Sequence, residues 1–200
     1  MLSNSRLVAA TCLAAWLTLD EQSPPAHHRA QAAASCFCRA QDHHHAIVAL
    51  LFKPLYAPAY SLLRLQFEAY VRGLWLMECA SDAQVDAFVA GREAPQVDEL
   101  VRLIEDTPAF AQCVLDGVRG RVWRITCDYW QTDGLPLQRW TVGAPQPNFT
   151  FGEVEEVLRV AEIIAVASTV DLAHLAGNDK LAGQAQAELR LLVGAVPHRC

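Results

Sequence analysis

The chain has 200 residues, of which 52% are hydrophobic and 19% charged, a composition typical of a globular protein rather than a disordered or fibrous one. Sixteen lysines and arginines face 22 aspartates and glutamates, and the net charge of −6 argues against a broad surface for nucleic acid or anionic membrane. No Walker loop, dinucleotide-binding glycine motif, paired CxxC, HExxH or GxSxG occurs, so no strong motif assigns an activity.

The first apolar stretch, residues 5–19, allows two interpretations. Arg6 and the apolar run behind it resemble a secretory signal peptide. However, Asp20, Glu21 and a proline pair stand where a small-residue cleavage site is expected. We therefore favour an amphipathic first helix in a cytoplasmic protein and keep export as the alternative. The run is too short for a membrane-spanning helix, which needs about 20 residues.

Prolines and capping residues divide the next part of the chain into helices. A helix is predicted over 26–52, because Pro24-Pro25 precedes it and Lys53-Pro54 follows. A second covers about 55–79, where apolar residues recur every three to four positions. Three more are predicted: a short one from Asp82 to Gly91, one after Pro95 ending near Asp106, and a longer one from Thr107-Pro108 to Cys127.

The last third of the chain begins with a different pattern. Residues 131–151 carry glycines and prolines without a clear period, so we expect an ordered loop, with at most a short strand near 137–142. Thr150 with Glu153 forms a capping box that opens a long helix, Phe151 to about Ala176. A last helix covers about 180–193. The sequence thus predicts one all-α domain over 1–200, an up-down bundle whose two long central helices, 26–52 and 55–79, are antiparallel.

Charged residues form a stripe on the second long helix. Arg64, Glu68 and Arg72 follow each other at intervals of four, so they project from one side among apolar neighbours. We expect them to be largely buried and to contact the segment that carries Asp42, His43, His44 and His45. They form either an internal ion-pair network that fixes the register of the helices or the wall of a ligand pocket.

Two Asp-x-x-His pairs raise a metal site as a further hypothesis. Asp42 with His45 and Asp171 with His174 each place two ligands one turn apart, and Glu68 adds a carboxylate. Aspartate replaces the glutamate of carboxylate-bridged bundles, and no fourth carboxylate helix is identifiable. We therefore predict neither a metal nor a cofactor.

Aromatic and polar residues alternate where the helix before the loop ends. Trp130, Gln131, Arg139 and Trp140 belong to this stretch. The pattern suits either a well-packed loop that plugs one end of the bundle or a lid or partner surface, for which Trp130 and Arg139 are the candidate contacts. The seven cysteines are odd in number and lie mostly in apolar helical patterns, so we interpret them as small buried residues of a reducing compartment.

These motifs resemble a bacterial family of uncharacterised helical proteins. The runs DHHHAI at 42–47, SLLRLQFEAYVRGLWL at 61–76 and CASD at 79–82 carry the resemblance, which covers about residues 26–185. The family pattern joins an acidic-His-His group, an Arg-x-x-x-Glu-Ala-x-x-Arg-Gly-x-Trp core and a later loop with a histidine and two arginines. In that loop this chain departs from the pattern, because Gln131 replaces the histidine, Asp133 a glycine and Trp140 the second arginine.

The family in turn is similar in helical layout to the HEPN superfamily, which includes toxin and phage-defence ribonucleases. By that resemblance Arg39 would polarise a phosphate and His44 would act as the base, a spacing that also arises readily by chance. Their side chains lie about 140° apart around a regular helix. If the loop histidine is catalytic in relatives, Gln131 cannot replace it as an acid or base.

The sequence therefore leaves three function classes open. We favour a non-enzymatic interaction or ligand-binding module of a bacterial stress or phage-defence system over a HEPN-like ribonuclease and over a metal-dependent enzyme. The candidate binding residues are Asp42, His43, His44, Arg64, Glu68, Arg72, Trp130 and Arg139. We expect a protein or small ligand as partner, leave a homodimer open, and expect neither a membrane nor nucleic acid.

Overall fold

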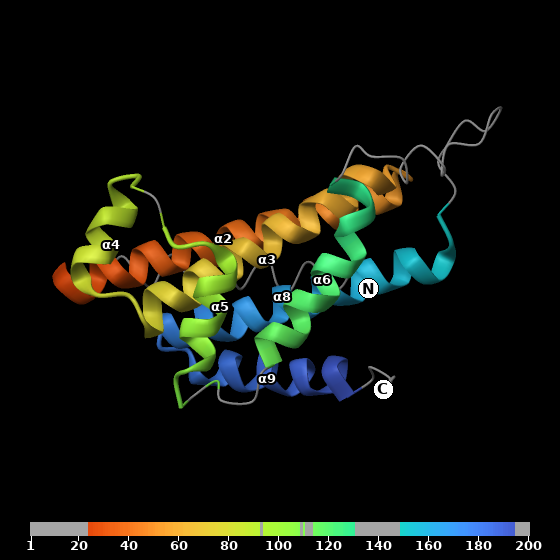
Figure 1. The fold of residues 1–200 in the computed structure, drawn as a ribbon. Helices are drawn as coiled ribbons and strands as arrows, with labels where there is room; N and C mark the ends of the chain where they lie inside the picture. Colours follow the sequence, from red (N-terminus) through yellow and green to blue (C-terminus); the bar gives the residue numbers. More distant parts are fainter. Residues whose placement is uncertain (1–23, 93, 109, 111–113, 131–148, 195–200) are drawn as a thin grey trace.

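A computed structural model gives the fold and describes residues 24–92, 94–108, 110, 114–130 and 149–194. The described residues form seven helices and no strand, which confirms the all-α bundle (Figure 1). The helix predicted over 5–19 and residues 131–148 of the loop predicted over 131–151 lie outside these residues. None of the described helices is long and apolar enough to span a membrane.

Two long helices, α2 (Pro24–Phe52) and α3 (Tyr56–Glu78), form the centre of the bundle (Figure 1). The helix α2 begins at Pro24 rather than after the proline pair, since proline is tolerated in the first turn of a helix. The two helices are antiparallel, as predicted. The Phe37 ring lies 5.9 Å from that of Tyr70, and the Arg29 guanidinium donates to the carbonyl groups of Leu76 and Ala80 at 2.6 Å.

Close packing between α2 and α3 depends on Gly73. A Cβ atom at this position would lie 2.5 Å from Cε1 of Phe37, closer than real contacts allow. The absence of a side chain therefore lets the Phe37 ring lie directly against the α3 backbone. Phe37, Leu63, Phe67 and Leu74 are among the fully buried residues of the resulting core.

Three shorter helices pack on the central pair: α4 (Asp82–Val89) on α2, and α5 (Val97–Glu105) and α6 (Val114–Trp130) on α3. The predicted start of the third at Thr107-Pro108 is wrong. The Thr107 hydroxyl donates to the carbonyl of Ile104 at 2.6 Å, so it completes the end of α5 instead of capping a new helix. The backbone N–H of Phe110 then closes a turn onto Thr107.

The helices α8 (Phe151–Leu175) and α9 (Asp179–Gly194) complete the fold. The predicted capping box is present, because the N–H of Thr150 donates to Glu153 Oε2 at 2.8 Å and the N–H of Glu153 donates to the Thr150 hydroxyl at 3.3 Å. Gly177, with a φ of 65°, follows the end of α8 in the left-handed conformation that glycine adopts without strain. From there α9 turns back along α8 (Figure 1).

Candidate functional site

The predicted charged stripe of α3 forms two ion pairs around one carboxylate. Arg64 Nε donates to Glu68 Oε1 at 3.0 Å, and Arg72 Nη1 donates to Glu68 Oε2 at 3.2 Å. The side chains of Arg64, Glu68 and Arg72 remain 30%, 17% and 31% exposed, so these ion pairs lie at the rim of the core and are not closed to solvent.

The helical repeat explains why the charged stripe is partly exposed and not largely buried as the sequence predicted. Leu63, Phe67 and Val71 are buried and define the core face of α3. Each residue of the charged stripe follows one of them and is therefore rotated by about 100° around the helix axis. Apolar neighbours in sequence therefore show only that the charged stripe lies next to the core face of α3. They do not show that the charged side chains are buried in the core.

The helix α6 supports one end of the stripe. The Arg64 guanidinium lies over the ring of Trp123, 4.5 Å from its centroid, and Trp123 also makes an edge contact with Phe67 at 6.1 Å. A cation held over an indole face gains electrostatic attraction from the ring. Arg64 is therefore positioned by a carboxylate on its own helix and by an aromatic ring on the next.

Arg39 of α2 and Arg72 of α3 both act electrostatically on Cys36 of α2. Burial raises the pKa of the Cys36 thiol to about 11, and the nearby positive charges of Arg39 and Arg72 oppose that rise. Both guanidinium groups therefore lie within electrostatic range of the same thiol, one from each of the two helices. We call Arg39, Arg64, Arg72 and Glu68 the arginine strip.

The histidines beside the strip are held in the neutral form. Burial lowers the pKa of His43, the positive charge of Arg39 lowers it further, and Asp42 opposes the change. For His44, burial together with the charge of His45 lowers the pKa to about 4. A neutral imidazole is able to accept a proton, but only where substrate can reach it.

The two residues proposed for ribonuclease chemistry differ in access to solvent. Arg39 is exposed, whereas His44 is 3% exposed and neither of its ring nitrogens has a hydrogen-bond partner among the described residues. This difference follows from the angle of about 140° between their positions on a regular helix. In this conformation the pair does not face one solvent-reachable cleft.

Sequence reasoning missed a buried polar seam where α8 meets α2 and α3. Gln41 Nε2 donates to the carbonyl of Ala165 at 2.5 Å, and Gln66 Nε2 donates to that of Ala161 at 2.8 Å. The Oε1 atoms of both glutamines are buried without a partner in the described part of the chain. The sequence feature that could have revealed this seam is the position of both glutamines among the apolar core residues of α2 and α3.

A strongly perturbed carboxyl group belongs to Asp171 on α8. Burial raises its pKa to about 7, a hydrogen bond from Tyr70 opposes that rise, and the charge of Glu78 adds to it. Asp171 Oδ2 is buried and has no partner among the described residues. Burial and this neighbour also raise the pKa of the Tyr70 hydroxyl, which stays protonated and donates to the carboxylate.

The two Asp-x-x-His pairs do not converge. Asp42 and His174 are exposed, while Asp171 faces Tyr70. Among the residues described, no three His, Cys, Asp or Glu side chains lie close enough to hold a metal ion. Gln131, Arg139 and Trp140 lie outside the described residues, as does the side chain of Trp130, the last residue of α6.

The model of a family of unknown function (DUF6988) matches residues 37–192, and the chain belongs to this family. The match includes the whole arginine strip and both ends of the Tyr70–Asp171 contact. No curated protein and no solved structure matches the chain.

Proposed function

We propose that the chain is a non-enzymatic ligand-binding module and that its arginine strip binds an anionic group, a phosphate or a carboxylate. The observation that carries the proposal is that the charges of Arg39 and Arg72, from two helices, both act on Cys36, while Arg39 is exposed and the Arg72 side chain is 31% exposed. Following the family resemblance, we place this module in a stress or phage-defence system of the bacterial cytoplasm.

The charge of the strip supports an anionic ligand. Arg64 and Arg72 both pair with the single carboxylate of Glu68, and Arg39 adds a third guanidinium to the strip, a positive excess in a chain of net charge −6. A guanidinium carries five N–H donors in a planar fork that matches phosphate and carboxylate groups. The bond from Arg72 to Glu68 uses one of them, and Arg39 is exposed. We assign Arg39 and Arg72 to the ligand and Arg64 to positioning, because Glu68 and Trp123 already hold it.

The surroundings of the strip favour binding over catalysis. Cys36, on whose thiol the charges of Arg39 and Arg72 act, has a pKa of about 11 and stays protonated, so it is a poor nucleophile. His44 lies in the core, away from any polymer that reaches Arg39. These two facts weigh against acyl-transfer chemistry and against ribonuclease chemistry by Arg39 with His44.

The test is isothermal titration calorimetry of the protein with inorganic phosphate, pyrophosphate, ATP and citrate. Arg39→Ala and Arg72→Ala should each weaken the tightest ligand by about 10- to 100-fold, because a charge-assisted hydrogen bond contributes about 1.5–3 kcal/mol. Arg124→Ala is the matched control: it removes the same charge from α6, where Arg124 pairs with Glu156 on the surface. Equal affinities for the strip variants and this control would reject the arginine strip as the site.

The same protein should leave RNA intact. Incubation of wild type with structured and single-stranded RNA tests the alternative directly. If wild type cleaves RNA and His44→Ala does not, while the variant keeps its helical circular dichroism signal, the protein is a HEPN-like ribonuclease and the proposed binding module is wrong.

A further inference from the structure

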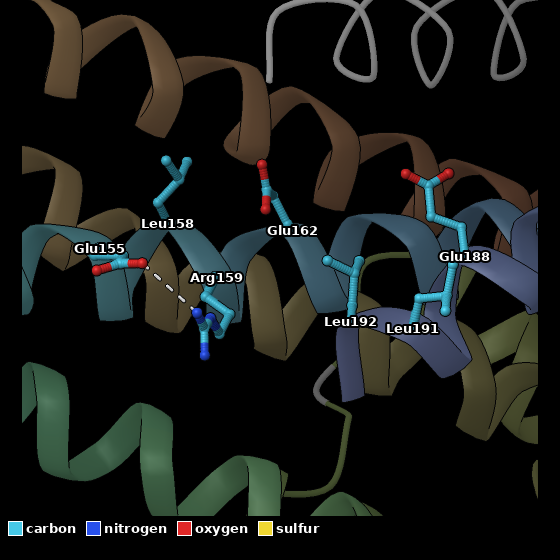
Figure 2. A pocket seen from close by; sticks show the side chains of 7 residues that line it. All are labelled: Glu155, Leu158, Arg159, Glu162, Glu188, Leu191 and Leu192. Carbon is cyan, nitrogen blue, oxygen red and sulfur yellow. Dashed lines mark ion pairs between the residues drawn. The ribbon is translucent and has the colours of Figure 1, made fainter. Parts of the chain in front are cut away.

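A groove between α8 and α9 lies apart from the arginine strip. It has a volume of about 350 Å³ (Figure 2). Leu158, Leu191 and Leu192 form its apolar part, and Leu191 is 75% exposed. Its charged lining consists of three carboxylates and one guanidinium: Glu155, Glu162, Glu188 and Arg159.

The charges of this groove favour a basic occupant. Arg159, the one guanidinium among the described residues of the lining, lies 3.6 Å from Glu155 of its own helix. Glu162 of α8 and Glu188 of α9 stand on either side of Leu192 in Figure 2. Burial raises the pKa of Glu162, the charge of Glu188 adds to that rise, and the charge of Arg159 opposes it. A cation placed between these two carboxylates would relieve both the burial and the repulsion.

We propose that this groove holds the N-terminal segment of the same chain, residues 5–19. The segment is apolar, and its only charged side chain is Arg6. Arg6 would lie between Glu162 and Glu188, while Leu7 and Val8 would cover the leucines. This proposal is independent of the arginine strip.

The direction of the helices brings the segment to the groove. Gln66 and Tyr70 of α3 contact Ala161 and Asp171 of α8, so α3 and α8 are parallel and α2 is antiparallel to α8. Gln41 lies opposite Ala165, and Pro24 is one end of α2, about 25 Å further along the axis. Glu162 lies about 5 Å from the level of Gln41, on the side away from Pro24. The distance along the axis from Pro24 to Glu162 is therefore about 30 Å.

The length of the segment matches this distance. The helix that the sequence predicts over 5–19 would span about 22 Å, and the four residues between it and Pro24 would add at most about 13 Å. A segment that turns back along α2 therefore brings its Arg6 end to the level of Glu162 and Glu188. With a much shorter connection between the predicted helix and Pro24, Arg6 would not reach the level of Glu162.

Hydrogen exchange of the full-length protein, read by mass spectrometry, tests the proposal. Amides of residues 7–17 should exchange at least tenfold faster in Leu191→Asp than in wild type. Leu65→Asp is the matched control, because Leu65 is an exposed leucine on α3. Arg6→Glu should also speed exchange, and Glu162→Arg combined with Arg6→Glu should restore protection.

Three results would overturn the proposal. The first is an N-terminal segment without protection in wild type, and the second is equal protection in wild type and Leu191→Asp. The third is protection that disappears on dilution, since the occupant would then be the segment of a second copy.

Discussion

Asp171 and His44 should give this protein opposite and nearly cancelling dependences of stability on pH. The pKa of Asp171 rises from 3.8 to about 7 in the folded state, so the folded chain holds this proton more tightly than the unfolded chain. The free energy of unfolding therefore falls as the pH rises from about 4 to about 7. At about 1.4 kcal/mol per pKa unit, the total loss is about 4 kcal/mol.

His44 acts with the opposite sign. Its pKa falls from 6.5 to about 4, so the unfolded chain takes up this proton first as the solution becomes acidic. The free energy of unfolding then falls as the pH drops from about 6.5 to about 4, by about 3 kcal/mol in total. Between pH 4 and 6.5 the two slopes are equal and opposite, and their sum in wild type is close to zero.

Single variants separate the two slopes. Asp171→Asn keeps an oxygen that accepts from the Tyr70 hydroxyl and removes the charge. Relative to wild type, it should gain stability as the pH rises, by up to about 4 kcal/mol at pH 8. His44→Met removes a ring whose nitrogens lack partners, and its gain over wild type should grow below pH 6.5. Urea unfolding at pH 4 to 8, followed by circular dichroism, measures both. A difference between Asp171→Asn and wild type that is constant with pH would refute the reasoning.

Two further predictions concern packing and thiol reactivity. Gly73→Ala should lower the free energy of unfolding by about 1–2 kcal/mol in urea titrations, because overpacking against Phe37 exceeds the gain in helix propensity. Gly183→Ala, where no atom lies within 4 Å, should instead raise it by up to about 1 kcal/mol, and a stabilised Gly73→Ala would contradict the close contact. Cys36, buried and with a thiol pKa of about 11, should resist iodoacetamide at pH 8 in the folded protein but not in urea, as mass spectrometry will show.

Local signals predicted most of the helices correctly. The antiparallel hairpin of α2 and α3 follows from two apolar helical patterns joined by Lys53-Pro54, and the capping box from Thr150 and Glu153. Both depend on residues close together in sequence. The start of α6 was predicted wrongly because a threonine before a proline is compatible with either the end of one helix or the start of the next.

The candidate site was less accessible to sequence reasoning. The ion pairs of Glu68 follow from a spacing of four residues, but their place at the rim depends on which face of α3 the other helices cover. The contact of Tyr70 with Asp171 joins residues about a hundred positions apart, and no local pattern announces it. The burial of His44 likewise depends on how α2 packs against the other helices. The local sequence does not show this packing, so it suggested that His44 was accessible and able to act as a base.

The arginine strip and the buried titratable groups should respond independently to mutation. Arg39 is exposed, so Arg39→Ala should change the free energy of unfolding by no more than about 0.5 kcal/mol while weakening anion binding. Asp171→Asn acts through an atom without solvent access, so it should shift the pH dependence of stability and leave anion affinity unchanged. Calorimetry and urea unfolding on the same two variants test this separation. A loss of anion affinity in Asp171→Asn would mean that the buried carboxyl group and the strip belong to one coupled site, and a binding module with a passive interior would then be the wrong description.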